Sequence, residues 1–363
     1  MRVAVAGAGA FGRNHLRVLR ELESAGLGAA LVAAVEPEPK RADEAAALYG
    51  IPVFSSVDQL LSASVKADAA CVAVPTVHHH SVASALLDAG LDLLVEKPLA
   101  ASLSEADELL QKAEQNGRIV QPGHLERFNP AVLAAQPRIS RPMFFEAHRL
   151  SVFTPRALDV DVVLDLMIHD LDIVLTFAGS PVREVRAVGL PILSPRVDIA
   201  NVRVEFESGC VANFTASRVS TERVRKLRYF EPRQYVSIDY ARRDLLVIRV
   251  DSETAMPAEL AAAIAAGRVD AETLAAARPS GALPGFKFIK PEVAPGEPLR
   301  LEILSFLESV RTRRAPQVTA QQGRAALALA LEIQSAMAAH AQRAGLGDFF
   351  RSSTTAQGTG IGH

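Results

Sequence analysis

The sequence of 363 residues has no tryptophan, only two cysteines and an aromatic content of 5%. Cys71 and Cys210 cannot build a disulfide framework, and their apolar, strand-like surroundings favour a reduced setting. No apolar run approaches the ~18 residues that a membrane-spanning helix needs. The N-terminal residues enter a glycine motif directly and lack the apolar core of a signal peptide. We therefore expect a cytoplasmic protein that makes no contact with a membrane.

An excess of charge of one sign is also missing, since 39 Lys and Arg balance 41 Asp and Glu to a net charge of -2. This balance gives no electrostatic basis for nucleic acid as the main partner. The sequence contains no internal repeat. At about 150 residues per domain, its length predicts two domains.

Residues 1–122 are predicted to form the first domain, because short apolar runs alternate there with amphipathic helical patterns. Strands that are apolar throughout are buried on both faces, which indicates a parallel sheet with right-handed helical crossovers. The predicted fold class is therefore α/β, with an N-terminal Rossmann domain built on a doubly wound parallel sheet. The predicted strands are Val3–Ala6, Leu31–Val35, Ala69–Val74, Leu91–Val95 and Arg118–Gln121.

Residues 123–347 follow a different pattern and are predicted to form a C-terminal α+β domain. A long helix is expected after Gly123, followed by alternation of apolar and polar residues that is typical of a large open, mostly antiparallel sheet. The second face of such a sheet can pair with another subunit. Residues 251–298 are predicted to be rich in loops, and residues 348–363 to be a disordered tail. The predicted strands are Phe144–Leu150, Val182–Val188, Asn201–Phe206, Cys210–Ser217 and Arg228–Asp239.

The clearest local motif is Gly7-Ala8-Gly9-Ala10-Phe11-Gly12, which follows the first predicted strand and opens the first predicted helix. In this context Gly7 permits a tight turn, Gly9 lets a pyrophosphate approach the backbone, and Gly12 allows close contact between helix and strand. The backbone N–H groups and the helix dipole can then bind phosphates. We predict that Gly7, Gly9, Ala10, Phe11 and Gly12 contact a dinucleotide cofactor.

Glu36 lies at the end of the second predicted strand, where a carboxylate can accept both hydroxyls of an adenosine ribose. The same carboxylate would repel a 2′-phosphate, so its position favours NAD over NADP. Lys40 and Arg41 lie close by in the sequence and could reach a phosphate, which leaves NADP as the alternative.

A second charged group, Glu96-Lys97-Pro98, closes the predicted strand Leu91–Val95. Ligands of doubly wound sheets bind beyond the carboxyl ends of the strands, so Glu96 and Lys97 are predicted to face the cofactor crevice. A residue before proline is restricted in conformation, which fixes the direction of Lys97. Thr76 and His79 are expected to line the same crevice. The three histidines at positions 78–80 diverge on a helix, so we predict no metal site.

Residues 161–179 are predicted to form one helix that is apolar on nearly every face, begins at Asp159 or Asp161 and ends at Gly179. Asp165, His169 and Asp172 form a single polar stripe on it. Buried carboxylates and imidazoles are costly unless they are paired or used. Two interpretations stay open: a satisfied structural network, or a catalytic histidine that Asp165 orients and makes more basic.

Other polar residues are weaker candidates. His124, Arg127 and Asn129 follow the fifth predicted strand and are expected to face the crevice as substrate ligands. A basic group in the second domain is either a solvated sheet edge or a contact for an anionic part of the substrate. Its members are Arg218, Arg223, Arg225, Lys226 and Arg228.

With its glycine loop at 7–12, Glu96-Lys97-Pro98 and Asp165-x-x-x-His169, in this order, the chain resembles the Gfo/Idh/MocA family over nearly its whole length. The resemblance implies an NAD(P)-dependent oxidoreductase that acts on the CH–OH group of a sugar or cyclitol. It implies that Lys97, Asp165 and His169 form the catalytic group, that the Lys97–Pro98 bond is cis, and that the C-terminal sheet makes a homodimer or homotetramer.

The strings at 123–130, 146–150 and 159–170 are similar to a narrower branch, the UDP-N-acetylglucosamine 3-dehydrogenases. This resemblance implies oxidation of a sugar-nucleotide 3-hydroxyl to a ketone that is later aminated for lipid A-type glycolipids. It also implies that Arg149 and Asp172 lie with the substrate. The proton acceptor is His169 or, with the roles exchanged, Lys97. The alternatives are another sugar or cyclitol dehydrogenase of the family, an NAD-dependent glycosidase, and a non-catalytic NAD-binding regulator.

Overall fold

The structure is a computed structural model that describes residues 1–153, 160–250 and 286–346. The chain forms two compact units, each composed of two stretches of sequence. The first unit holds Met1–Phe128 and Gly296–Leu331, and the second holds Asn129–Pro295 and the residues from Glu332 onward. The predicted tail at 348–363 and most of the predicted loop-rich segment lie outside the described residues.

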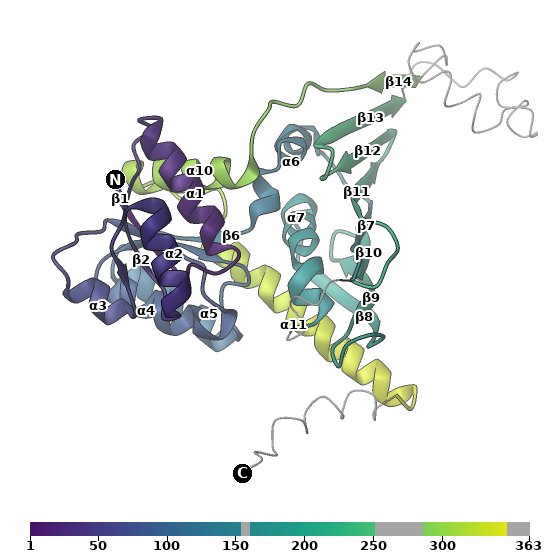
Figure 1. The fold of residues 1–363 in the computed structure, drawn as a ribbon. Coiled ribbons are helices and arrows are strands. Elements are labelled where there is room, and N and C mark those ends of the chain that lie inside the picture. The colour runs from purple at the N-terminus through teal and green to yellow at the C-terminus, as the bar shows by residue number, and fades with distance from the viewer. Residues whose placement is uncertain (154–159, 251–285, 347–363) are drawn as a thin grey trace, which may run out of the picture. The chain divides into compact units, whose positions relative to one another are not determined.

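The first unit is built on a six-stranded parallel sheet with the strand order β3-β2-β1-β4-β5-β6 (Figure 1). This order and direction confirm the predicted doubly wound sheet. β3 is an addition, because a strand of two residues leaves no pattern in the sequence. The strands are β1 (Arg2–Ala6), β2 (Ala30–Val35), β3 (Val53–Phe54), β4 (Ala69–Val72), β5 (Asp92–Glu96) and β6 (Val120–Gly123).

The helices of this unit begin and end where the side chains predict. Ser56 and Ser102 accept N–H groups at the starts of α3 and α5, and Gly50 ends α2 in the left-handed conformation. α1 and α4 pack against the sheet with buried leucines such as Leu16 and Leu86. The helices are α1 (Gly12–Ser24), α2 (Pro39–Tyr49), α3 (Val57–Ser62), α4 (His79–Asp88) and α5 (Leu103–Gln115).

α10 (Pro298–Thr312) completes the core of the first unit from far along the chain. Its residues Ile303 and Phe306 are fully buried in one cluster with Val5 and Leu19. The arginine of α1 at position 17 also pairs with Glu297, with 2.5 Å between Nη2 and Oε1. The nucleotide-binding core therefore uses a segment that lies well beyond the predicted first domain.

The second unit is built on an eight-stranded sheet with the order β14-β13-β12-β11-β7-β10-β9-β8 (Figure 1). All pairs are antiparallel except β7 with β10, as predicted for a mostly antiparallel sheet. Figure 1 shows α6 (Pro130–Ala135) and α7 (Ile168–Ala178) on one face of it. The strands are β7 (Phe144–Leu150), β8 (Val182–Leu190), β9 (Ile199–Phe206), β10 (Val211–Ser217), β11 (Val224–Glu231), β12 (Gln234–Asp239), β13 (Asp244–Val250) and β14 (Phe286–Ile289).

Two local predictions for this unit are wrong. The long helix expected after Gly123 is a short helical turn, then α6, then another turn, because the side chain of Asn129 caps α6 and Pro137 follows its end. The single strand expected over 228–239 is the pair β11 and β12, joined at Arg233 in a left-handed conformation. A tight turn at 207–209 joins β9 to β10 as a hairpin, with Gly209 at a φ of 82°.

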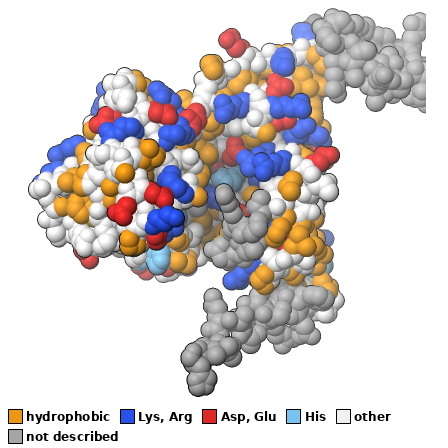
Figure 2. Space-filling model, in the orientation of Figure 1, with side chains coloured by type: hydrophobic (Ala, Val, Ile, Leu, Met, Phe, Trp, Pro, Cys, Tyr) orange, Lys and Arg blue, Asp and Glu red, His pale blue; other side chains and the backbone are white. Residues whose placement is uncertain are grey.

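α11 (Ala320–Arg343) is the last described helix, and the division between the units falls within it. Both cysteines are buried and unbridged. Among the described residues, no helix is long and apolar enough to cross a membrane. Positive and negative side chains are interspersed on the face seen in Figure 2.

Candidate active site

The glycine loop between β1 and α1 can hold only glycine at two of its positions. Gly7 has a φ of 96°, and a Cβ there would lie 2.6 Å from the carbonyl oxygen of Ala73. A Cβ at Gly12 would lie 1.9 Å from the carbonyl oxygen of Gly7. Gly9 differs, because a Cβ there would meet no atom within 4 Å. The loop is therefore closely packed at Gly7 and Gly12 and has open space beside Gly9.

The open side of the loop fits the phosphates of a dinucleotide. No side chain caps α1 at Phe11, and its first turn contains no acidic residue, so its N-terminal dipole is available to an anion. Ala10 and Phe11 are exposed beside it, and the Phe11 side chain is 39% exposed. The residues present therefore fit a nicotinamide dinucleotide, as the motif predicts.

Glu36 follows β2 and connects the glycine loop to its surroundings. Its side chain is 3% exposed, and Oε2 accepts the N–H of Ala8 at 2.8 Å. Oε1 accepts the N–H of Glu38 at 3.1 Å and pairs with Nη2 of Arg41 at 3.1 Å. The carboxylate that is expected to bind ribose thus contacts the glycine loop directly. The same carboxylate forms an ion pair with Arg41.

Glu96-Lys97-Pro98 lies at the carboxyl end of β5, and its Lys97–Pro98 bond is cis, as the family resemblance implied. Lys97 is half-buried. His79 is buried against this segment. Its Nδ1 lies 2.8 Å from the carbonyl oxygen of Pro98, and its Nε2 lies 2.9 Å from the carbonyl oxygen of Val74. Burial lowers the pKa of His79, which keeps the ring neutral. Its expected role in cofactor binding stays a prediction, as does that of half-buried Thr76.

His15 was not predicted as part of the site, although it lies next to the Glu96-Lys97-Pro98 segment. Its ring is fully buried in α1, and Nε2 lies 2.8 Å from Oε1 of Glu96. Burial disfavours the charged imidazole, but Cys71 and Glu96 outweigh burial and raise the pKa of His15 to about 10. The sequence signal that could have indicated His15 is its position three residues after Gly12, the last glycine of the motif.

The second unit carries the other predicted catalytic residues on one helical segment. Asp161 starts it, since Oδ1 accepts the N–H groups of Val163 and Leu164 at 2.9 and 3.1 Å. The alternative start, Asp159, lies outside the described residues. Residues 163–167 form a π-helix that leads into α7, and Gly179 ends α7 at a φ of 56°. Single π-helical turns are rare and are frequent at functional sites.

The predicted polar stripe is only partly exposed. Asp165 lies on the π-helical turn and His169 lies in the first turn of α7, and both are half-buried. Asp172 is 2% exposed. Their roles in catalysis and substrate binding stay predictions.

Asp170, beside His169, is a residue that the sequence analysis missed. It forms a two-pronged ion pair with Arg149 of β7, with distances of 2.7 Å to Nε and 3.0 Å to Nη2. Both side chains are 3% exposed, and the guanidinium lies 5.0 Å from the ring centre of Tyr240. Arg149, predicted to bind substrate, therefore fastens the helix that carries His169 to the sheet.

The remaining candidates are largely buried. His124 is 1% exposed, and Arg127 donates to the carbonyl oxygen of Gln317 at 3.3 Å. Asn129 caps α6 and donates to the carbonyl oxygen of Tyr240 at 3.0 Å. In the basic group of the second unit, Arg218 is 5% exposed and 3.4 Å from Asp198, so this member is no solvated edge.

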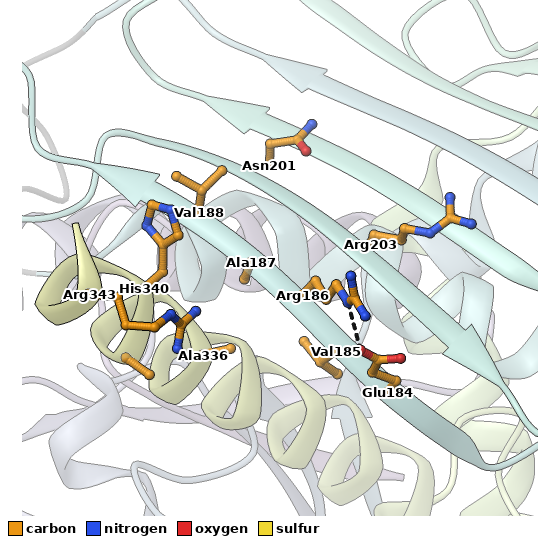
Figure 3. A pocket seen from close by; sticks show the side chains of 11 residues that line it. Glu184, Val185, Arg186, Ala187, Val188, Asn201, Arg203, Ala336, His340 and Arg343 are labelled. Atoms are coloured by element: carbon orange, nitrogen blue, oxygen red, sulfur yellow. Dashed lines mark hydrogen bonds and ion pairs between the residues drawn. The ribbon is translucent and has the colours of Figure 1, made fainter.

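The second unit also has a pocket that is distinct from the predicted site. It runs around the edge strand β8, between β9 and the end of α11, and Figure 3 shows its mixture of charges. Glu184 and Arg186 in it pair with each other at 2.6 Å. None of the predicted site residues lines it. Over the described ranges, no group of His, Cys, Asp and Glu is suited to hold a metal ion.

Comparison with known proteins defines the class. Residues 1–124 match the family model of the oxidoreductase family with an NAD-binding Rossmann fold, and residues 133–233 match the Gfo/Idh/MocA C-terminal domain. The chain belongs to the Gfo/Idh/MocA oxidoreductase family. It is therefore an NAD(P)-dependent oxidoreductase that acts on CH–OH groups, as the resemblance implied.

Two relatives differ in how much of this chain they match. UDP-N-acetylglucosamine 3-dehydrogenase of Acidithiobacillus ferrooxidans is 32% identical over 94% of this chain and 99% of its own. A solved structure of that enzyme is similar with a TM-score of 0.80, covering 93% of this chain and 98% of that one. The scyllo-inositol 2-dehydrogenase (NAD(+)) of Bacillus subtilis is 29% identical, over 61% of this chain and 68% of its own.

Proposed function

We propose that this chain oxidises the 3-hydroxyl of UDP-N-acetylglucosamine with NAD and forms the 3-keto sugar nucleotide. The observation that carries the proposal is the similarity to the Acidithiobacillus ferrooxidans enzyme, which extends over 94% of this chain and so includes both units. The similarity to the inositol dehydrogenase covers only 61% of this chain. We place the choice of substrate in the second unit, so a match that includes that unit supports the sugar nucleotide.

In the proposed reaction, bound NAD supplies the hydride acceptor. His169 accepts the proton of the 3-hydroxyl, and Asp165 orients its ring and stabilises the imidazolium. Lys97 donates a hydrogen bond to the same oxygen and stabilises the negative charge that develops on it. The substrate-binding roles expected for His124, Arg127 and Asn129 stay predictions, since these residues are 1%, 4% and 3% exposed. The half-buried state of Asp165, His169 and Lys97 supports these roles, because such groups are partly desolvated and still reachable.

Lys97→Met tests the proposed catalyst. The methionine keeps the length of the side chain but cannot stabilise an oxyanion, so kcat should fall by about 10²–10³-fold. The Kd of NADH, measured by its fluorescence, should stay within about twofold. Lys66→Met removes an exposed lysine of the same unit and serves as the control. A Lys97→Met variant with the turnover of that control would remove the lysine from the mechanism.

The substrate is tested with UDP-N-acetylglucosamine that carries deuterium at C3. The proposal expects deuterated NADH and a sugar nucleotide that has lost one deuterium and one hydrogen, both identified by mass spectrometry. Free N-acetylglucosamine and myo-inositol are the comparison substrates. Faster reduction of NAD with myo-inositol would assign the chain to a cyclitol, and loss of hydrogen from another carbon would overturn the 3-keto product.

We further propose NAD as the preferred cofactor, because the buried carboxylate of Glu36 lies where a 2′-phosphate would be repelled. We also propose a homodimer or homotetramer that uses the outward face of the eight-stranded sheet. Aromatic rings support this choice, since Phe230 lies 5.5 Å from Phe144 and 5.2 Å from Tyr235 between ring centres. Aromatic residues are enriched in protein interfaces.

A further inference from the structure

Two buried histidines contact the segment Glu96-Lys97-Pro98 on either side of the lysine. His15 of α1 reaches the residue before Lys97, with 2.8 Å between its Nε2 and Oε1 of Glu96. His79 of α4 reaches the residue after Lys97, with 2.8 Å between its Nδ1 and the carbonyl oxygen of Pro98. The two rings are 0% and 1% exposed. Both are therefore shielded from solvent and rigidly packed.

The contact of His15 is transmitted to the backbone of the lysine. Oε2 of Glu96 accepts the backbone N–H of Lys97 at 3.3 Å, while Oε1 of the same carboxylate is held by His15. Gly123 of β6 packs closely against this carboxylate, since an added Cβ there would lie 3.0 Å from its Oε1. His15, Glu96 and the Lys97 amide thus form one continuous chain of contacts.

His79 holds the other end of the segment. Its two ring nitrogens face carbonyl oxygens on separate loops, that of Pro98 after β5 and that of Val74 after β4. A neutral imidazole has one N–H, so it donates to one of these oxygens in each tautomer. The ring also fills the space between the two loops, because it is 1% exposed.

We propose that His15 and His79 are positioning residues that fix the backbone of Lys97, so that its ammonium is presented to the reacting oxygen in one place. The inference rests on the proposed function, in which Lys97 stabilises that oxygen. Neither histidine contacts substrate in this proposal. Their effect is on kcat, because displacing a catalytic group by about 1 Å can cost on the order of 10²-fold.

Variants of the two histidines distinguish a hydrogen-bond donor from a ring that only fills space. His15→Leu removes the donor to Glu96, whereas His15→Gln keeps an N–H donor in reach. We expect kcat to fall at least about tenfold in His15→Leu and His79→Leu, with the Kd of NADH within about twofold, and to be largely restored in His15→Gln. If His15 acts through Glu96, adding His15→Leu to Glu96→Gln should cost less than in the parent chain.

Val18→Ala is the matched control. Val18 is fully buried in the same helix, α1, so its truncation destabilises that helix and leaves the hydrogen bond from His15 to Glu96 in place. Equal losses of kcat in Val18→Ala and His15→Leu, at equal losses of thermal stability, would overturn the proposal. If His15→Leu does not fold, His15→Gln and His79→Leu are compared with Val18→Ala by the same criterion.

A spectroscopic measurement tests the positioning without turnover. The chain has seven lysines, so selective ¹⁵N-lysine labelling gives seven backbone amide signals, and Lys97→Met identifies the one from position 97. His15→Leu and His79→Leu should shift this signal more than the other six, and Val18→Ala should not. An unmoved signal in both histidine variants would overturn the proposal.

The two proposals fail in different ways. If Lys97→Met keeps full turnover, the proposed catalyst is wrong, while the amide signal still reports whether the histidines hold the segment. If Lys97→Met loses turnover and both histidine variants keep it, the proposed catalyst stands and the positioning role is wrong.

Discussion

Glu36 links the glycine loop to β2 through both oxygens of one buried carboxylate. The N–H of Ala8 is bound at 2.8 Å, and Arg41 is bound at 3.1 Å on the other oxygen. Arg41 also lies 3.3 Å from Glu38. The two acids together hold the arginine that could otherwise neutralise a 2′-phosphate, so the proposed preference for NAD rests on this group of three residues.

Glu36→Ala should therefore weaken the preference for NAD. Removing the carboxylate ends its repulsion of the 2′-phosphate and releases Arg41 as a phosphate ligand. We expect the ratio of kcat/KM for NAD to that for NADP to fall at least about tenfold, which corresponds to about 1.4 kcal/mol. Steady-state kinetics with both cofactors measure it. Asp43→Ala removes an exposed acid of the same helix, α2, and is the control. A ratio that changes equally in both variants would contradict the assignment.

The imidazole of His15 should make stability depend on pH. Its pKa is raised to about 10, because Cys71 and Glu96 outweigh the opposing effect of burial, whereas an unfolded histidine titrates near ~6.5. The folded form thus holds a proton that the unfolded form lacks between these values. The stabilisation is complete below pH ~6.5 and is lost as pH rises through 10.

Urea midpoints at a series of pH values check this expectation. The free energy of unfolding of the parent chain should exceed that of His15→Leu by less and less as pH rises from ~6.5 to about 10. A constant difference would show that the ring contributes only its volume.

The sequence could predict many site residues at this scale because motifs with fixed spacing encode local geometry. Gly7 and Gly12 followed from such a motif, and the cis Lys97–Pro98 bond followed from the family resemblance. The pairing of His15 with Glu96 could not be predicted, because 81 residues separate the partners and only the packed sheet brings α1 against the end of β5.

The segment that carries Asp165 and His169 shows what periodicity can reveal about an element. Its start at Asp161 and its end at Gly179 followed from capping rules, and both are observed. The π-helical turn at 163–167 did not follow, because the i→i+5 and i→i+4 hydrogen-bond patterns use the same residue types. The ion pair between Asp170 and Arg149 was missed since it joins this helix to a distant strand.

Breaking that ion pair should destabilise the second unit. Arg149→Leu leaves the carboxylate of Asp170 buried without its main partner, which costs about 3–5 kcal/mol. The double variant Arg149→Leu with Asp170→Leu should recover much of the loss, because neither charge then remains buried. Urea denaturation of the parent chain, the two single variants Arg149→Leu and Asp170→Leu, and the double variant gives the comparison. A double variant as unstable as the sum of the two single variants would contradict the coupling.

Phe306 tests the contribution of α10, which begins at Pro298, to a unit that begins at Met1. The ring is fully buried in the core with Val5 and Leu19. Phe306→Ala should cost about 3–5 kcal/mol and weaken NADH binding, although it lies far from the glycine loop in sequence. Phe214→Ala, in the core of the second unit, is the matched control. Equal NADH affinity and equal protease resistance of residues 1–128 in both variants would argue against this role.

At the scale of the molecule, composition and strand patterns predicted the fold class of both units, but not how the chain is divided between them. Residues 296–331 belong to the nucleotide-binding unit. The amphipathic pattern of α10 shows that it buries one face, but the pattern does not say against which core. Its apolar residues would suit either unit, so the sequence could not assign it.

The proposed assembly is also a property of the whole molecule. Phe230→Glu places a charge among the rings of Phe144 and Tyr235 on the outward face of the sheet and should dissociate the oligomer. Sedimentation velocity should then show the monomer mass. Arg242→Glu, whose side chain is 82% exposed, is the control. A Phe230→Glu protein that sediments as the parent does would place the interface elsewhere.

The position of α10 has a consequence for how the protein is made. The glycine loop leaves the ribosome among the first residues, yet the core beneath it is incomplete until Ile303, Phe306 and Val310 have been translated. A nascent chain that stops before residue 296 thus carries every element of the parallel sheet and still exposes apolar surface on α1. We expect such a chain to be prone to aggregation until α10 is available to cover that surface.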